Sequence, residues 1–231
     1  MSSTSSPSTS AEQPIEAVVF DWDGTLVDSK RALIASFRET TAEVIGEPFP
    51  TAPEDVERMI QVRGREAFEE IAGGDPDLLE RIEEVFHRVY VARQTTIQPF
   101  PGALETLARL RGAGHRLGVA TSKARIRLDL EAERTGIGAL IDVSISGDEV
   151  EAAKPDPEQV AAAIAALGAD PARTLYVGDG PNDVLAGRGA GAVTVAVTFG
   201  FHPEEARAAA PDHVVDSLPE LIGLAGVARS A

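Results

Sequence analysis

The sequence predicts an α/β protein built on a doubly wound parallel sheet, with an α-helical cap inserted into it. Two observations predict this fold. Short apolar runs alternate with helical stretches through most of the chain, and parallel strands need such crossover helices. One long stretch after the first run shows helical spacing only, which indicates an inserted helical unit.

Six short apolar runs, most of them β-branched, are the predicted strands. They are AVVF at 17–20, LGVA at 117–120, DVSI at 142–145, TLYV at 174–177, VTVAV at 193–197 and HVV at 213–215. Helices are predicted at 103–111 and from Asp156 to Gly168, because Asp-Pro suits a helix start and glycine a helix end. Residues 217–231 predict a final helix with a frayed end.

The stretch from Ser29 to Phe100 is the predicted cap, and no strand is expected in it. It is far longer than an ordinary connection between a strand and a helix. Three of its segments have apolar residues at helical spacing, namely 31–45, 53–60 and 76–92. The sequence therefore predicts a disordered Ser- and Thr-rich tail, a catalytic core in two pieces and a cap, at 1–13, at 14–28 with 101–231, and at 29–100.

The charge of the chain limits its partners. Its 37 acidic residues against 21 Lys and Arg give a net charge of −16, which disfavours binding to nucleic acid or to an anionic membrane. A phosphorylated substrate would need local cations or a metal ion to reverse this field. The absence of cysteine excludes disulfides, and without a targeting or membrane-spanning segment a cytoplasmic location is expected.

Polar residues follow four of the predicted strands, at the points where the strands end. In chain order they are Asp21, Asp23 and Gly24 in DWDGT, Thr121 and Ser122, Lys154 with Pro155, and Asp179 and Asp183 in GDGPND. Each group alone has an ordinary explanation as a turn or a helix cap. Because the carboxyl ends of parallel strands meet at one edge of a sheet, all four groups are expected to form one site.

The chemistry of these groups suits a phosphate and a metal ion. Hydroxyls and backbone N–H groups at Thr121 and Ser122, near a helix start, favour an anion. Lys154 is one of only two lysines between residues 31 and 231, the other being Lys123, and it can neutralise a phosphate. Mg²⁺ prefers hard oxygen ligands. The side chains that offer them are Asp21, Asp179 and Asp183.

In order and residue type these four motifs resemble those of the haloacid dehalogenase superfamily, across residues 15–223. The resemblance implies a Rossmann-like core with strand order 5-4-1-2-3 and Asp21 on the central strand. The helical insert is similar to the cap of phosphoglycolate phosphatase-like and β-phosphoglucomutase-like members. Dehalogenases and phosphonatases of the superfamily have no acid where this chain has Asp23, which argues against both activities.

The resemblance also implies a role for each motif residue. Asp21 would attack phosphorus and form an aspartyl-phosphate, and Asp23 would be the general acid and base. The phosphate would be held by Thr121, Lys154, Gly24 and Ser122. The implied Mg²⁺ ligands are Asp21, Asp23 through its backbone carbonyl, Asp179 and Asp183.

Two arginines of the cap, Arg63 and Arg65, flank Gly64 and are candidate substrate-binding residues. An arginine fork can hold a carboxylate or a second phosphate on the leaving group. The alternative is a pair of solvated arginines that contact neighbouring glutamates.

The predicted function is a Mg²⁺-dependent phosphatase that hydrolyses a small phosphate monoester. A sugar phosphomutase would use the same Asp21 and Asp23, and an inorganic pyrophosphatase is a further alternative. A phospho-accepting receiver domain is the alternative from another class, but it has no use for a cap or for a general acid at position 23. Phosphoglycolate, a sugar phosphate, a nucleotide and pyrophosphate remain candidate substrates, and the oligomeric state stays open.

Overall fold

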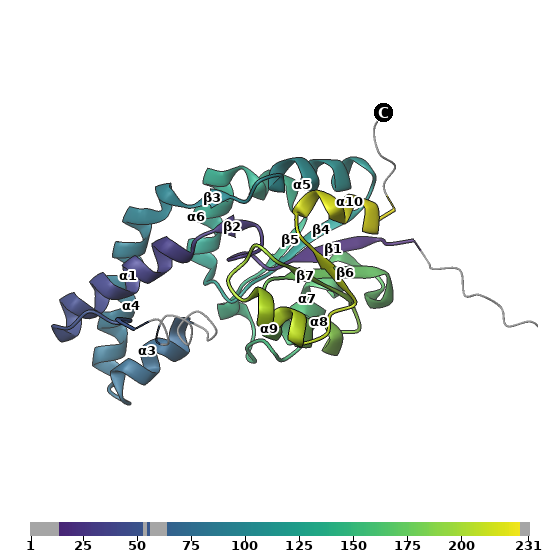
Figure 1. Ribbon diagram of the computed structural model, residues 1–231. Helices are drawn as coiled ribbons and strands as arrows, with labels where there is room; N and C mark the ends of the chain where they lie inside the picture. The colour runs from purple at the N-terminus through teal and green to yellow at the C-terminus, as the bar shows by residue number, and fades with distance from the viewer. Residues whose placement is uncertain (1–13, 53–54, 56–63, 227–231) are drawn as a thin grey trace, which may run out of the picture.

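A computed structural model describes residues 14–52, 55 and 64–226 and shows a six-stranded parallel sheet between two layers of helices (Figure 1). The strand order is β5-β4-β1-β6-β7-β8, and every neighbouring pair is parallel. The strands are β1 Ala17–Phe20, β4 Arg116–Ala120, β5 Val143–Ile145, β6 Thr174–Gly178, β7 Val193–Val197 and β8 His213–Val215. The predicted fold class and order are confirmed, and β8 adds a sixth strand at one edge.

The central strand β1 is fully buried because each of its two sides packs against a layer of helices. Val18 and Phe20 belong to a cluster that includes α5 Ala103–Gly112 and α6 Arg125–Thr135, whereas Ala17 and Val19 pack on the opposite layer. That opposite layer is formed by α7 Glu158–Leu167 and α8 Pro181–Gly189. The short helices α9 Pro203–Ala208 and α10 Leu221–Leu224 complete the core.

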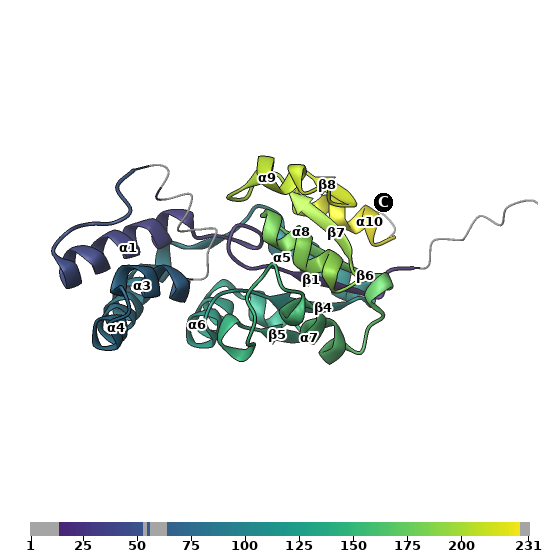
Figure 2. The same cartoon turned by 90° about the horizontal axis from the view of Figure 1, so that it is seen from below.

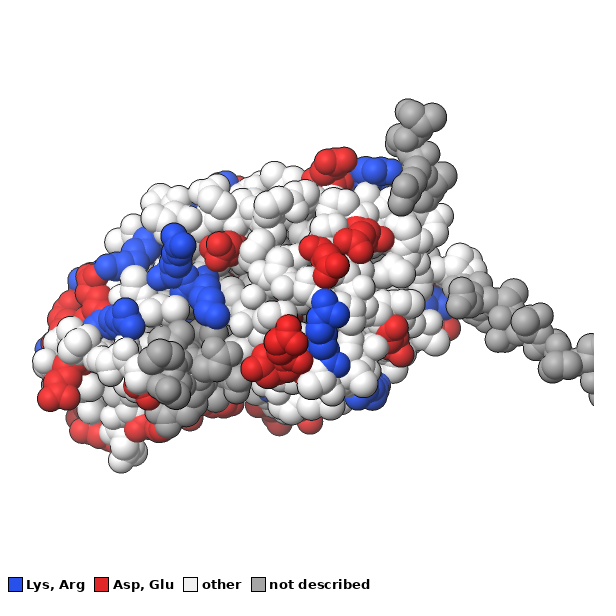
Figure 3. All heavy atoms as spheres, viewed as in Figure 1, with Lys and Arg blue, Asp and Glu red and all other residues white. Residues whose placement is uncertain are grey.

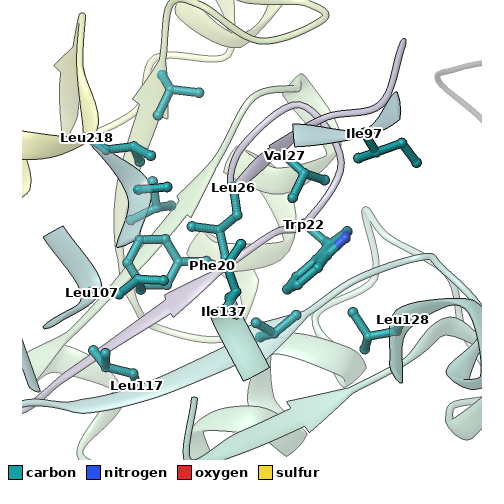
Figure 4. Close-up of a cluster of buried hydrophobic side chains, with 14 of the residues drawn as sticks. Phe20, Trp22, Leu26, Val27, Ile97, Leu107, Leu117, Leu128, Ile137 and Leu218 are labelled. Carbon is teal, nitrogen blue, oxygen red and sulfur yellow. The ribbon is translucent and has the colours of Figure 1, made fainter. Parts of the chain in front are cut away.

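The larger apolar cluster lies beside the loop that follows β1. In Figure 4 the Trp22 ring lies among Val27, Ile97 and Leu128, with Phe20 of β1 to its left. All of these side chains are buried. The residues on either side of Trp22 are therefore fixed to the core by its large apolar ring.

The helical unit stands at one end of the sheet, with α6 as the core helix that faces it (Figure 2). It contains α1 Lys30–Ile45, α3 Gly64–Ala72 and α4 Pro76–Arg93. Its own core is a triad of rings, Phe37, Phe68 and Phe86, whose centroids are 4.9 Å apart in each pair. The apolar spacing at 31–45 and 76–92 predicts α1 and α4, and Phe37 and Phe86 are among the apolar residues that produce it.

The chain enters and leaves the helical unit through two short antiparallel strands, β2 Val27–Asp28 and β3 Gln98–Pro99. The expectation of no strand between Ser29 and Phe100 is therefore wrong at β3. Two residues are too few to produce an alternating pattern, so the sequence carries no signal for this strand. The predicted tail 1–13 and the segment 53–60, apart from Asp55, lie outside the described residues.

No helix in the described part of the chain is long and apolar enough to cross a membrane.

Candidate active site

The site lies at the carboxyl ends of β1, β4 and β6, where the parallel strands finish at one edge of the sheet. Asp21 follows β1 directly, and its backbone N–H donates to the carbonyl of Val177 on β6 at 2.8 Å. Thr121 follows β4, and its N–H donates to the carbonyl of Ile145 on β5 at 3.0 Å. Ladder hydrogen bonds thus hold both residues in place.

Lys154 links two of the predicted acidic residues. Its Nζ lies 2.8 Å from Asp21 Oδ1 and 2.7 Å from Asp183 Oδ1, and it also donates to the Tyr176 hydroxyl at 3.2 Å. Burial alone would lower the pKa of Lys154, but the charges of Asp183 and Asp21 outweigh burial and hold that pKa well above its usual value. The ammonium therefore stays charged between the two carboxylates.

Asp21, Asp179 and Asp183 form a buried acidic cluster whose ligand oxygens lie within 4.8 Å of one another. Burial, with the neighbouring charge of Asp183, raises the pKa of Asp21 to about 7 and that of Asp179 well above its usual value. Lys154 supplies only one positive charge for three acids. An additional hard cation would offset the remaining repulsion, so the donor set fits a divalent metal ion.

Asp183 is held from two sides. Its Oδ2 accepts the backbone N–H groups of Asp179 at 3.2 Å and Gly180 at 3.1 Å, while Lys154 occupies Oδ1. These bonds explain the GDGPND spacing, because a carboxylate in the first turn of α8 accepts the N–H groups at the start of its own helix. Asp183 therefore shapes the loop that carries Asp179.

Asp23, two residues after Asp21, points to a different set of partners. Its Oδ1 accepts the hydroxyl of Ser29 and lies 3.2 Å from Lys123 Nζ. About a fifth of its side chain is exposed (21%), in contrast to 9% for Asp21. The Asp21 carboxylate is therefore enclosed within the acidic cluster, whereas the Asp23 carboxylate is partly exposed to solvent.

Gly24 packs directly against the acidic cluster. Its φ of +81° is in the left-handed region, and a Cβ at this position would lie 2.1 Å from Asp179 Oδ2. The site thus needs a residue without a side chain here, for both conformation and space. Ser122 is similarly close-packed, since a Cβ on Gly147 would meet the Ser122 carbonyl oxygen at 2.4 Å.

The structure therefore brings together all the core residues that the sequence singles out. Asp21, Gly24, Asp179 and Asp183 lie in or against the acidic cluster, with Lys154 between two of them, whereas Asp23 lies two residues further along the same loop, beside Ser29 and Lys123. Thr121 and Ser122 lie in the loop from β4 to α6. Of the cap arginines, Arg63 lies outside the described residues; Arg65 belongs to α3, and its side chain also lies outside the description.

The model of the haloacid dehalogenase-like hydrolase family matches residues 18–197, which include every motif of the site. The chain belongs to this family. The resemblance drawn from the four motifs is confirmed.

Relatives of this haloacid dehalogenase-like hydrolase match it over nearly its whole length. Pyrophosphatase PpaX of Bacillus velezensis is 32% identical over 94% of this chain and 99% of its own. Phosphoglycolate phosphatase of Caulobacter vibrioides is 35% identical over 87% of this chain and 86% of its own. The crystal structure of CbbY from Rhodobacter sphaeroides in complex with phosphate is 27% identical, covers 90% of this chain and 96% of that one, and has a TM-score of 0.80.

Several residues around the site of this hydrolase carry no signal in the sequence. Tyr176 lies in the middle of an apolar strand, yet its hydroxyl contacts both Lys154 and Asp183. Glu131 lies on α6 and Tyr90 on α4, and helical spacing does not say which polar residue of a helix turns inward. Both are buried, and both contact Lys123.

Charge is distributed unevenly over the surface of the hydrolase. In Figure 3, Lys and Arg gather over the helical unit near its junction with the sheet, while acidic side chains are scattered over both parts. A chain with a net charge of −16 thus presents local positive charge on this face. Such a region attracts small anions more strongly than the net charge suggests.

The tight contact at Gly24 generates a prediction with a matched control. We expect Gly24→Ala to lower kcat/KM about 100-fold, because the new methyl group displaces the Asp179 carboxylate. Gly46 has nearly the same φ, +83°, but a Cβ there meets nothing within 4 Å. Gly46→Ala should therefore share the conformational cost of about 1 kcal/mol in unfolding free energy and keep its activity. Equal activity in the two variants would contradict the close packing at Gly24.

Proposed function

We propose that this hydrolase is a Mg²⁺-dependent phosphatase that acts on a small phosphate monoester through an aspartyl-phosphate at Asp21. The observation that carries the proposal is the pairing of a buried carboxylate, held by Lys154 beside Asp179, with a second, partly exposed carboxylate at Asp23. The two acids differ in environment although only one residue separates them. Different environments suit different tasks, a nucleophile and a proton carrier.

The proposed reaction has two displacements. In the first, a carboxylate oxygen of Asp21 attacks phosphorus, the bond from phosphorus to the leaving oxygen breaks, and Asp23 donates a proton to that oxygen. In the second, Asp23 takes a proton from a water molecule, whose oxygen attacks the phosphorus of the aspartyl-phosphate. Inorganic phosphate leaves and the carboxylate of Asp21 is restored.

The remaining motif residues would bind the phosphoryl group. The hydroxyl and N–H groups of Thr121 and Ser122, with the loop at Gly24, offer donors to the phosphoryl oxygens. Lys154 would hold the nucleophile in place and offset charge on the phosphate. From the sequence, we also propose that Arg63 and Arg65 contact the leaving group.

We propose that Mg²⁺ is held by the carboxylates of Asp21 and Asp179 and by the backbone carbonyl of Asp23. Asp183 would act indirectly, because Lys154 and two N–H groups already occupy its oxygens. When bound, Mg²⁺ offsets the negative charge of the nucleophile and of the phosphoryl group.

Two substrates merit direct comparison. A small phosphate ester such as phosphoglycolate corresponds to the name of the Caulobacter relative, and inorganic pyrophosphate to that of the Bacillus relative. We expect a panel of phosphate esters and pyrophosphate, ranked by kcat/KM, to show release of inorganic phosphate from one of these two classes. Interconversion of sugar phosphates without phosphate release would favour the phosphomutase alternative instead.

The two aspartates predict separable losses. Asp21→Asn should abolish turnover, because an amide does not form the aspartyl-phosphate. Asp23→Asn should lower kcat by about 10²- to 10⁴-fold, because proton transfer is lost while phosphate still binds. Circular dichroism should show both variants folded. Activity near that of the wild type in either variant would contradict the assigned roles.

The metal site predicts a change in stability as well as in activity. Mg²⁺ should raise the Tm of the wild-type protein, because at a hundredfold excess over Kd it adds about 2.7 kcal/mol to the free energy of unfolding. EDTA should abolish turnover. Asp179→Asn should strongly weaken both effects of Mg²⁺. Asp216→Asn, which removes an exposed acid paired with Arg207, should respond to Mg²⁺ as the wild type does. Full activity in EDTA would contradict the metal site.

A further inference from the structure

A buried polar network joins the active site to the helical unit. Lys123 Nζ lies 2.6 Å from the Tyr90 hydroxyl and 2.9 Å from Glu131 Oε1. The Tyr90 hydroxyl in turn donates to Glu131 Oε1 at 2.7 Å, and the indole N–H of Trp22 donates to Glu131 Oε2 at 2.8 Å. Lys123, Glu131, Tyr90 and Trp22 are here called the Lys123 network.

The burial of this network is unusual for charged residues. Lys123 is 5% exposed and Glu131 is fully buried. Removing two charges from water is costly, and a buried ion pair is often no more stabilising than apolar side chains of similar volume. Stability alone therefore gives a poor account of the pair.

The Lys123 network contacts Asp23 of the active site. Lys123 Nζ is 3.2 Å from Oδ1 of Asp23, so the three donors of the ammonium face three acceptor oxygens, on Tyr90, Glu131 and Asp23. Ser29 also donates to Oδ1 of Asp23. Both contacts therefore favour one orientation of the plane of the Asp23 carboxylate.

The Trp22 side chain attaches the loop that carries Asp23 to the same network. Its indole N–H is bound to Glu131, and its residue lies between Asp21 and Asp23 in the chain. The loop and the Asp23 side chain are thus both attached to one buried carboxylate, directly through Trp22 and indirectly through Lys123.

We propose that Lys123 is a positioning residue for Asp23, clamped by Glu131 and by Tyr90 of the helical unit. This inference rests on the proposed role of Asp23 as proton donor. Lys123 does not touch the substrate in this account; it holds the carboxylate of Asp23 at one orientation, from which the proton reaches the leaving oxygen. Because Tyr90 lies on α4, the helical unit contributes to that orientation.

Leaving-group dependence tests a positioning role, because a purely structural residue would not respond to it. Phenyl phosphate needs a proton on its departing oxygen, whereas 2,4-dinitrophenyl phosphate does not. Values of kcat/KM report the steps up to formation of the aspartyl-phosphate. Each variant is therefore described by two losses of kcat/KM, one for each substrate.

The double variant Lys123→Met/Glu131→Gln removes both buried charges; the glutamine keeps an oxygen acceptor for the Trp22 indole N–H and offers an N–H donor to the Tyr90 hydroxyl in place of the oxygen that accepted from it. We expect its kcat/KM for phenyl phosphate to fall about 10- to 100-fold, with a much smaller fall for 2,4-dinitrophenyl phosphate. Tyr90→Phe, which removes one hydroxyl, should show the same preference to a smaller extent. Both variants are measured as the full chain with Mg²⁺.

Two further variants give the reference and the control. Asp23→Asn should show the strongest dependence on the leaving group. Arg116 lies at the opposite end of β4, and its ion pair with Glu16 at 2.9 Å is far along the strand from Lys123. Arg116→Met should lower stability without any preference between the two substrates.

The outcomes separate the positioning role from the proposed function. A dependence on the leaving group in Asp23→Asn but not in Lys123→Met/Glu131→Gln would overturn the role of Lys123. If Tyr90→Phe had the wild-type ratio of kcat/KM between the two substrates, the contribution of the helical unit would be overturned. Absence of the dependence in Asp23→Asn itself would refute the proposed role of Asp23, and the role of Lys123 with it.

Discussion

The burial of three carboxylates at one edge of the sheet is the constraint on which the site depends. Asp21, Asp179 and Asp183 lie close enough for strong mutual repulsion, and burial deprives them of water. Lys154 offsets part of this charge. A divalent cation would offset the rest, so the mutual repulsion of the three carboxylates favours binding of the metal ion.

The fold meets this constraint through its strand ends. Parallel strands bring Asp21, Thr121 and Asp179 to one edge, and the start of α8 supplies N–H groups for Asp183. Gly24 lets the loop after β1 approach Asp179. The same loop turns Asp23 away from the acidic cluster and toward Ser29 and Lys123. One short segment therefore presents two carboxylates with different surroundings.

Much of this arrangement could be predicted from the sequence, because it depends on local patterns. Apolar runs mark the strands, and the polar residues that follow them lie at one edge by the geometry of a parallel sheet. The contacts of Glu131 could not be predicted, because they depend on how α6 meets α4 across a long separation in the chain. Strand β3 could not be predicted for another reason, because a strand of two residues shows no alternation of apolar and polar side chains. The apolar pattern of β6 predicts that Tyr176 is buried in a strand, but it does not predict that the Tyr176 hydroxyl contacts Lys154 and Asp183.

In the proposed mechanism the phosphoryl group is transferred to Asp21 first and to water second. In Asp23→Asn, 2,4-dinitrophenyl phosphate should still phosphorylate Asp21, because its leaving group needs no proton, while hydrolysis of the aspartyl-phosphate lacks its general base. Rapid acid quenching followed by mass spectrometry of the peptides measures this directly. We predict a phosphoryl group on Asp21 in close to one copy per enzyme molecule. Continued release of dinitrophenolate with no phosphoryl group on Asp21 would contradict the account.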